Sequence, residues 1–399
     1  MKILRLRSAK DLILFSLAIA FLVFSLFRVW GQWRHSANIE KNIPTLVFSY
    51  WWEDKNEILE RIKNEFQELY PGIKISLDFR PYEDLRGGGK GEPWDIIALD
   101  QLWVPLFLDQ EWIENDEFPL LNFFHPLFYN IDILRNAGFS RPPRTRTEFL
   151  AQLRAAANPA AGRYGIALAL EPDNVRGIYR DVYSWLWAGG LLLEDLETPV
   201  QANRVSAETR ALIETLEFLA LLQNEGILFP GPLSLGEHEK RRAFLEGRIA
   251  FMIGSAEDME ILRQELGEGR FDYTAIPAPD AYTGKPIFGS GVWSLAIAKE
   301  SEHKEEAHRF IAFLLENSSL FAEGWAIPGN GNHMQPSDPF YSKAWEFYVN
   351  GDLIKELPMN GQEEFSREAI FREEIINLFQ GGISAAEAAG AIQRRMQGR

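Results

Sequence analysis

Residues 45–79 constrain the fold more than any other stretch, because they predict a β-strand, an α-helix and a second β-strand in direct succession. Residues 45–50 are β-branched and aromatic, which is typical of a buried strand. Apolar and polar residues alternate over residues 73–79, as in a half-buried strand. The helix between them carries an apolar residue at every fourth position: Ile58, Ile62 and Phe66. Such a unit requires a parallel sheet with a right-handed crossover.

Two tryptophans, Trp51 and Trp52, directly follow the first predicted strand. In parallel sheets, small ligands bind beyond the carboxyl ends of the strands. Core packing is the more common use of a single tryptophan, but two neighbouring indoles at a turn cannot easily both face a core. The pair therefore favours a binding hypothesis over packing alone.

Strands and helices alternate through the rest of the chain, which is the pattern of an α/β fold. The 399 residues, 46% of them hydrophobic, suffice for two or three domains with large cores. Five further strands are predicted, at residues 95–99, 164–170, 248–254, 271–276 and 292–298.

The charge and the lack of cysteine exclude several classes of function. The net charge of −16 argues against a nucleic-acid partner, since phosphate backbones are bound by clustered Lys and Arg. The chain has no Cys, so disulfides, thiolate metal sites and cysteine nucleophiles are excluded. The same lack excludes the acylated cysteine of a bacterial lipoprotein.

The N-terminus has the pattern of a membrane anchor. Residues 12–27 form an uncharged, mostly apolar run that spans roughly 24 Å as a helix, after a leader with four basic residues. We therefore expect an uncleaved signal anchor, a single transmembrane helix, within residues 1–31, and a polar tether over residues 32–42. The basic leader stays in the cytoplasm, so the body lies on the extracytoplasmic side of the cell membrane. A cleaved secretion signal is the alternative, although Ser36-Ala37 makes a poor cleavage site.

No motif in the sequence indicates catalysis. The glycine-rich residues 87–91 lack the Ser or Thr of a phosphate-binding loop and do not open a helix. The six His form no zinc-binding pair on a helix. No pair of carboxylates stands out among the 57 acidic residues, so glycoside hydrolysis has no assigned residues. We expect no enzyme activity, no catalytic residues, no metal and no cofactor.

Aromatic residues beside acidic or small residues recur where predicted strands end. An indole can stack on the apolar C–H face of a sugar, while carboxylates accept hydrogen bonds from the hydroxyl groups at its rim. This composition indicates carbohydrate binding. The residues concerned are Trp51, Trp52, Asp100, Trp103, Trp185, Trp187 and residues 289–293.

An ordered series of segments covers nearly all of residues 45–399. It includes TLVFSYWW, YPGIKI, PWDIIALDQLWVPLFLDQEWI, RYGIALAL, SWLWAGG, EKRRAFLEGRIAFMIGSAEDM, FDYTAIPAP, FGSGVWSLAIAKESEHKEEAHRFIAFLLEN and GWAIPGN. With these segments in this order, the chain resembles the extracellular solute-binding proteins of ABC importers, family 1, the group similar to maltose-binding protein. No single segment is diagnostic, whereas the ordered set is fairly specific.

The resemblance implies a two-lobed, periplasmic-binding-protein-like α/β fold with discontinuous lobes and a hinge, preceded by the N-terminal transmembrane helix. The first lobe would comprise residues 43–125 and 258–316. The second lobe would comprise residues 126–257 and 317–399. In the family, the lobes close over a sugar by bending at the hinge, so the resemblance implies a receptor that delivers carbohydrate to an ABC importer.

The resemblance also implies the ligand-binding residues. Those in the first lobe are Trp51, Trp52, Asp100 and Trp103; those in the second are Trp185 and Trp187; Gly291 and Trp293 lie near the hinge. The implied partners are a sugar or oligosaccharide, the ABC permease subunits and the membrane, and the receptor would be a monomer.

Two segments are shorter than in the family. Residues 114–127 connect segments that the family separates by several tens of residues, and residues 80–93 replace a helix that normally lines the cleft. These departures leave an alternative open. The chain would then be a diverged solute-binding-protein scaffold with a sensing or protein-interaction role and no transport.

Overall fold

The computed structural model describes residues 43–52, 57–88, 93–172, 174–197, 206–322, 326–329, 338–350, 352–355 and 361–398. The expected anchor and tether, at residues 1–31 and 32–42, lie outside the described residues. Within the described ranges, no helix is both long enough and apolar enough to cross a membrane.

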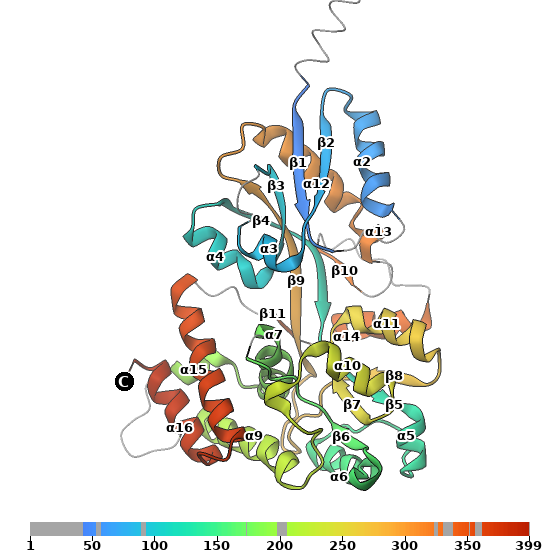
Figure 1. Cartoon of the computed structure of the whole chain (residues 1–399), viewed down its shortest axis with the longest axis vertical. Helices are drawn as coiled ribbons and strands as arrows, with labels where there is room; N and C mark the ends of the chain where they lie inside the picture. The colour runs from blue at the N-terminus through green and yellow to red at the C-terminus, as the bar shows by residue number, and fades with distance from the viewer. Residues whose placement is uncertain are drawn as a thin grey trace, which may run out of the picture.

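Two β-sheets organise the chain into two lobes (Figure 1). The first sheet has the order β10-β4-β9-β3-β1-β2, and β11 pairs with β9 beside this path. Its strands are β1 (Thr45–Tyr50), β2 (Lys74–Phe79), β3 (Ile96–Asp100), β4 (Ile113–Phe124), β9 (Ile287–Ala298), β10 (Ile327–Pro328) and β11 (Asp352–Lys355). The second sheet has the order β6-β7-β5-β8. Its strands are β5 (Leu127–Asn130), β6 (Tyr164–Ile166), β7 (Ile249–Ile253) and β8 (Phe271–Thr274). We call the parts built on these sheets lobe 1 and lobe 2.

The predicted strand–helix–strand unit is confirmed in lobe 1. β1 and β2 pair in parallel from Thr45 opposite Lys74 to Tyr50 opposite Phe79. The connecting helix α2 (Ile58–Leu69) buries the predicted apolar face against the sheet. β1 also pairs in parallel with β3, so the carboxyl ends of three strands meet at one edge of the sheet.

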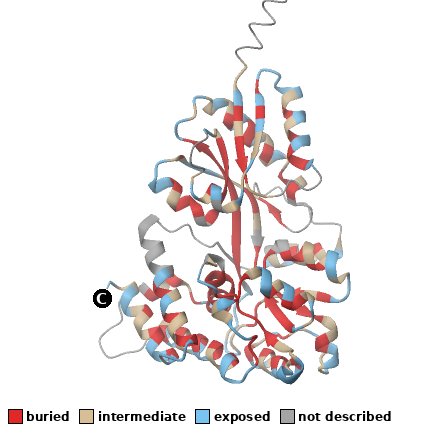
Figure 2. Ribbon diagram, viewed as in Figure 1, coloured by how far each residue is buried: buried red, intermediate tan, exposed pale blue. Residues whose placement is uncertain are grey.

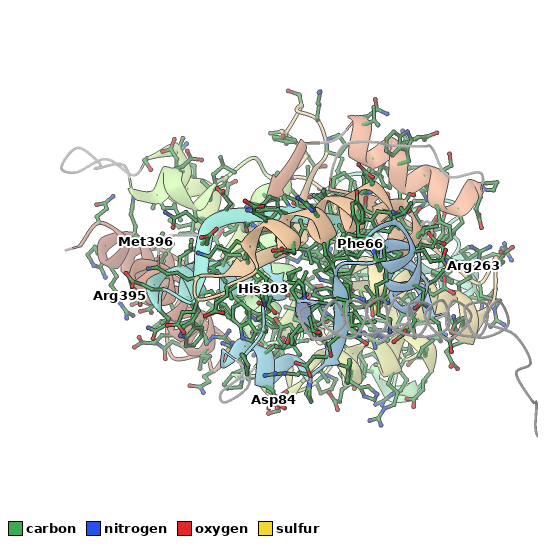
Figure 3. All side chains as sticks on the ribbon, turned by 90° about the horizontal axis from the view of Figure 1, so that it is seen from above. Phe66, Asp84, Arg263, His303, Arg395 and Met396 are labelled. Atoms are coloured by element: carbon green, nitrogen blue, oxygen red, sulfur yellow. The ribbon has the colours of Figure 1, made fainter. Side chains whose placement is uncertain are left out.

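Helices cover both faces of the lobe 1 sheet. They are α2, α3 (Tyr82–Arg86), η2 (Gln101–Trp103), α4 (Val104–Asp109), α12 (Lys304–Glu316) and α13 (Ser318–Ala322). Seen from above, Phe66 of α2 lies near the middle of the molecule (Figure 3), and its ring centroid is 4.9 Å from that of Phe310 in α12. This contact packs α2 and α12 side by side on one face.

Lobe 2 is mainly helical around its smaller sheet. Its helices are α5 (Ile131–Asn136), α6 (Arg146–Ala156), η3 (Pro159–Ala161), α7 (Val175–Ile178), the π-helix η4 (Tyr179–Tyr183), α8 (Ser184–Ala188), η5 (Leu193–Glu197), α9 (Ala207–Asn224), η6 (Pro232–Ser234), α10 (Glu237–Leu245), α11 (Ala256–Leu266), α14 (Pro339–Asn350), α15 (Gly361–Phe379) and α16 (Ala385–Met396). Arg263 of α11 and Arg395 of α16 lie at opposite sides of this lobe (Figure 3).

The long strand β9 links the two lobes. It is buried along nearly its whole length (Figure 2) and pairs with both β3 and β4. The chain passes from β4 in the first sheet to β5 in the second through His125-Pro126. The β4–β9 pair therefore forms the connection on which the lobes meet.

The sheets divide the chain differently from the expected lobes at two places. α11 and β8 follow residue 257 but belong to lobe 2, because Met259, Leu262 and Phe271 pack into its core. α13, β10 and β11 follow residue 317 but belong to lobe 1: Phe321 of α13 packs into its core, β10 pairs antiparallel with β4, and β11 pairs in parallel with β9. The strands β8 and β10 are short, and their sheet membership is decided by pairing with strands more than a hundred residues earlier in the chain.

Neither short segment is a plain connection. Most of residues 114–127 lies in β4, which pairs with β9 through two shifts in register. Residues 82–86 form the helix α3 inside the segment expected to lack one. No strand was predicted over β4, because charged residues and Pro119 interrupt any alternation of apolar and polar side chains.

Candidate ligand-binding site

Five aromatic rings meet where the lobe 1 strands end. We call Trp51, Trp52, Tyr82, Trp103 and Trp293 the ring cluster. The centroid of Trp51 lies 4.6 Å from that of Trp293, 5.0 Å from Tyr82 and 5.8 Å from Trp103. Trp52 stacks on Trp293 at 5.3 Å with only 10° between the ring planes. These separations are those of favourable aromatic pairs.

The sheet topology explains why these rings meet. Trp51 and Trp52 follow β1, and Trp103 follows the parallel neighbour β3, so both groups emerge at the same edge. Trp293 lies on β9 directly opposite Asp100, the last residue of β3. Trp51 and Trp52 are half-buried and keep accessible surface, whereas Trp103 and Trp293 are 2% and 8% exposed. The half-buried pair therefore provides the ring surface that a ligand can touch.

An exposed aromatic side chain extends the cluster to the end of β2. Phe79 is 54% exposed, and its ring centroid lies 5.7 Å from that of Tyr50. Tyr50 in turn lies 5.7 Å from Trp52. The rings thus continue from the buried side of the cluster to the solvent.

Polar groups border the ring cluster at the end of β3. The Asp100 carboxylate is 6% exposed and accepts a hydrogen bond of 3.2 Å from the Tyr82 hydroxyl. Gln101 is 3% exposed, and within the described structure neither its side-chain nitrogen nor its side-chain oxygen has a hydrogen-bond partner. The indole nitrogen of Trp51 is likewise buried without a partner among the described residues.

Sequence reasoning missed two residues of this site. Tyr82 lies on α3, in a segment expected to lack a helix. Gln101 stands beside Asp100 at a strand end, a position that could have marked it, but an uncharged amide carries no distinctive pattern in a sequence. Both residues belong to the site through their position in three dimensions.

Trp185 does not join the ring cluster. Its side chain is fully buried in lobe 2, with its ring centroid 5.2 Å from both Phe149 and Phe218. Its backbone oxygen accepts a hydrogen bond of 2.5 Å from Arg146. The residue therefore has no accessible surface for a ligand in this structure.

Trp187 packs where the lobes are connected. It is 3% exposed, and a Cβ atom at Gly289 of β9 would stand only 2.4 Å from its ring. Gly289 thus permits a close approach of the Trp187 ring to the β9 backbone. Gly291, also on β9, pairs with Phe123 of β4 and lies two residues before Trp293.

Lobe 2 contains a network of four charges, of which Lys240, Asp181 and Arg180 are buried and Glu237 is partly exposed. The Lys240 ammonium is 2.8 Å from Asp181 and 3.1 Å from Glu237, and Arg180 is also 3.1 Å from Glu237. Burial alone would raise the pKa of the Glu237 carboxyl, but the two cations outweigh it and lower this pKa to about 2. The charges compensate one another, as buried charges must. This network supports the structure of lobe 2.

The site suits a neutral, hydroxyl-rich ring. Half-buried indoles offer apolar faces, Asp100 accepts hydrogen bonds, and Gln101 and Trp51 hold unused hydrogen-bonding atoms. Within the described ranges, no group of three or more His, Asp or Glu side chains could hold a metal ion.

A model of the family "Bacterial extracellular solute-binding protein" matches residues 52–319. A curated relative from Deinococcus radiodurans, described as a probable ABC transporter-binding protein, is 24% identical over 201 residues. That match covers 47% of this chain and 44% of the relative, so the aligned part is less than half of either protein.

Solved structures share the fold over most of the chain. An ABC substrate-binding protein from Listeria monocytogenes, in complex with cycloalternan, has a TM-score of 0.69 and 14% identity, covering 89% of this chain and 98% of that one. Maltose-bound MalE3 from T. maritima has a TM-score of 0.69 and 16% identity, covering 89% and 99%. At these identities the likeness establishes the two-lobed α/β architecture.

Proposed function

Because the chain belongs to the family of bacterial extracellular solute-binding proteins, we propose that it is a carbohydrate receptor that delivers a sugar to an ABC importer. This family consists of solute-binding proteins rather than enzymes. The observation that carries the proposal is the ring cluster at the carboxyl ends of the lobe 1 strands. Relatives of the same architecture, named as bound to cycloalternan and to maltose, give it further support.

The proposed contacts are those of lobe 1 and of β9. Trp51 and Trp52 stack on the C–H faces of the sugar, and the Asp100 carboxylate accepts hydrogen bonds from its hydroxyl groups. Each charge-assisted hydrogen bond of this kind contributes about 1.5–3 kcal/mol where water is excluded. Trp103 and Trp293 hold the half-buried pair in place from behind. Gly291 lies beside them on β9 and gives the ligand room.

Trp185 and Trp187 have supporting roles in this proposal. Trp185 fills the core of lobe 2, and Trp187 packs against the linking strand β9. Neither ring offers accessible surface, so neither is a proposed ligand contact.

Closure by hinge bending is part of the proposal. The connection through β4, β5 and β9 is narrow compared with either lobe (Figure 1), and a ligand that touches both lobes favours the closed arrangement. The ligand's difference in affinity for the closed and the open arrangement sets how far the population shifts toward the closed one. A difference of about 5.5 kcal/mol moves the ratio of closed to open from 1:99 to 99:1. The closed receptor then meets the permease subunits as a monomer.

We further propose that the body works outside the cytoplasm, attached to the membrane. The family is described as extracellular, and residues 12–27 have the composition of an anchor helix. A polar tether over residues 32–42 would link this helix to β1.

Isothermal titration calorimetry of the full chain in detergent tests the proposed function. The titrants are maltose, maltotriose, cellobiose, lactose, sucrose and trehalose. We expect saturable heat for at least one of them. A folded protein that binds no carbohydrate, checked by its circular dichroism, contradicts the proposal.

A further inference from the structure

Gln101 is the first residue after β3; it directly follows Asp100 and comes two residues before Trp103 in the chain. Its side chain is 3% exposed, and both its nitrogen and its oxygen lack a hydrogen-bond partner within the described structure. A buried amide without partners is unfavourable, because it has lost its hydrogen bonds to water. Because nearly all buried polar groups in folded proteins are hydrogen-bonded, an unpaired one indicates a partner that binds there.

Other buried amides in the described ranges make at least one hydrogen bond, although the side-chain oxygen of Gln152 has no partner there. The Gln152 side chain, also 3% exposed, donates from its nitrogen to the backbone oxygen of Arg141 at 3.1 Å. The Asn130 side chain, 5% exposed, accepts at 3.0 Å from the backbone nitrogen of Ile133. Gln101 differs from both because neither of its polar atoms is paired within these ranges, and because it directly follows Asp100 at the end of β3.

The chemistry of an amide limits which chemical groups can be its missing hydrogen-bond partner. A primary amide presents an acceptor oxygen and a donor nitrogen side by side. Two hydroxyl groups on neighbouring carbons of a sugar match both, since one hydroxyl donates and the other accepts. A carboxylate or phosphate offers acceptors only, so it would leave the amide oxygen unpaired and would stand beside the Asp100 carboxylate.

We infer that Gln101 is a specificity-determining residue of the site, and that its amide forms hydrogen bonds with two neighbouring free hydroxyl groups of a neutral sugar. This inference rests on the proposed function. It names the ligand class more closely: an uncharged sugar with an unsubstituted vicinal diol at the end of the ring cluster. Anionic sugars and sugars substituted at that diol are rejected.

The first test replaces Gln101 by leucine, Gln101→Leu, which keeps the volume and removes both polar atoms. We expect the melting temperature of the ligand-free protein to stay unchanged or to rise, because an unpaired buried amide has been removed. A residue with only a structural role would give a lower melting temperature instead.

The matched control is Gln152→Leu, which removes an equally buried amide that does make a hydrogen bond. We expect this variant to melt at a lower temperature and to bind sugar as the wild type does. Opposite signs of the two melting shifts separate an unpaired amide from a paired one.

The second test measures binding with the same six sugars and carries forward the one bound most tightly. Its mono-deoxy analogues, each lacking one hydroxyl, are titrated into wild type and into Gln101→Leu. We expect two analogues from adjacent positions to bind the wild type about 10²-fold more weakly than the parent sugar, since they leave the amide unpaired. In Gln101→Leu, the same analogues should bind at most about 3-fold more weakly than the parent sugar, because the amide that pairs with the missing hydroxyl is no longer present.

Three results overturn the inference while leaving the proposed function intact. They are wild-type affinity in Gln101→Leu, a lowered melting temperature of that variant, and a deoxy-analogue penalty that persists in it. If the folded wild type binds none of the six sugars, the proposed function itself fails and the inference with it.

Discussion

The two lobes use the same residue type in opposite ways. In lobe 1, Trp51 and Trp52 stand at strand ends, half-buried, and stack on further rings. In lobe 2, Trp185 lies on α8 and is enclosed by Phe149 and Phe218. The two residues that follow β1 keep accessible surface, whereas the ring of Trp185 on α8 does not.

The two lobes also differ in whether the buried polar groups discussed above have partners. The buried charges of lobe 2 are compensated by one another, as Lys240 is by Asp181 and Glu237. The Gln101 amide of lobe 1 has no such partner among the described residues. The four charges of lobe 2 are thus paired with one another, whereas both polar atoms of the Gln101 amide are unpaired in the described part of the chain.

The largest expected effect is on the stability of lobe 2. Trp185→Ala removes a fully buried indole and leaves a cavity, which destabilises a protein by about 3–5 kcal/mol. Urea unfolding followed by circular dichroism measures the loss. A loss below about 1 kcal/mol would contradict the enclosed position of this ring.

The second prediction concerns the buried charge network. Lys240→Met leaves the buried Asp181 carboxylate without its cation, while Glu237 keeps Arg180, and breaking a buried ion pair costs about 3–5 kcal/mol. Lys343→Met is the matched control, because the Lys343–Asp272 pair is about one-third exposed, with side chains 32% and 31% accessible. The control should lose no more than about 1 kcal/mol in the same urea experiment. Equal losses in the two variants would show that burial is not what distinguishes the pairs.

The third prediction concerns function in lobe 1. Trp51→Ala combined with Trp52→Ala should weaken sugar binding about 10²-fold, since two stacking rings are lost. The thermal transition should stay close to that of the wild type, because both rings are only half-buried. Calorimetric titration and a melting curve on the same preparation measure the two effects. Loss of the fold together with binding would place these rings in the core.

The smallest effect is expected at alkaline pH, again in lobe 2. Burial, followed by Asp272, raises the pKa of Tyr129, whose hydroxyl donates to that carboxylate at 2.9 Å. Burial, followed by a hydrogen bond to Glu260, raises the pKa of Tyr341 to about 12.

A raised folded-state pKa fixes the direction of the pH effect. The stability contributed by these tyrosines is fully present below pH 10, where they are neutral in both states, and is lost as the pH rises toward about 12. Phenolate absorbance during an alkaline titration should therefore reveal tyrosines that ionise only as the protein unfolds. Ionisation of all tyrosines near pH 10 in the folded protein would contradict these environments.

Local patterns in the sequence predicted the elements of both lobes. The strand–helix–strand unit at residues 45–79 and the parallel sheet followed from periodicity alone. Ser384 and Glu387, three positions apart in the chain, form a capping box at the start of α16. Ser206 caps α9 through the backbone nitrogen of Thr209. Such features succeed because each depends on residues three or four positions apart.

Periodicity and strand order explain the part of the candidate site that follows directly from strand ends, whereas Trp293 was named from its composition and from the resemblance. Trp51, Trp52, Asp100 and Trp103 come together because parallel strands end at one edge, a rule that sequence can apply. Trp293 joins them through antiparallel pairing between β3 and β9, nearly two hundred residues apart. Tyr82 and Gln101 were not foreseen.

The sequence by itself thus determined the strand–helix–strand unit of lobe 1 and the aromatic residues at its strand ends, because these depend on neighbours along the chain. The tertiary structure alone decided which tryptophans keep an open face and which amide stays unpaired. It placed Trp185 in a core and left Gln101 unsatisfied beside the ring cluster. Burial and pairing are set by residues that are distant in sequence, and no local pattern encodes them.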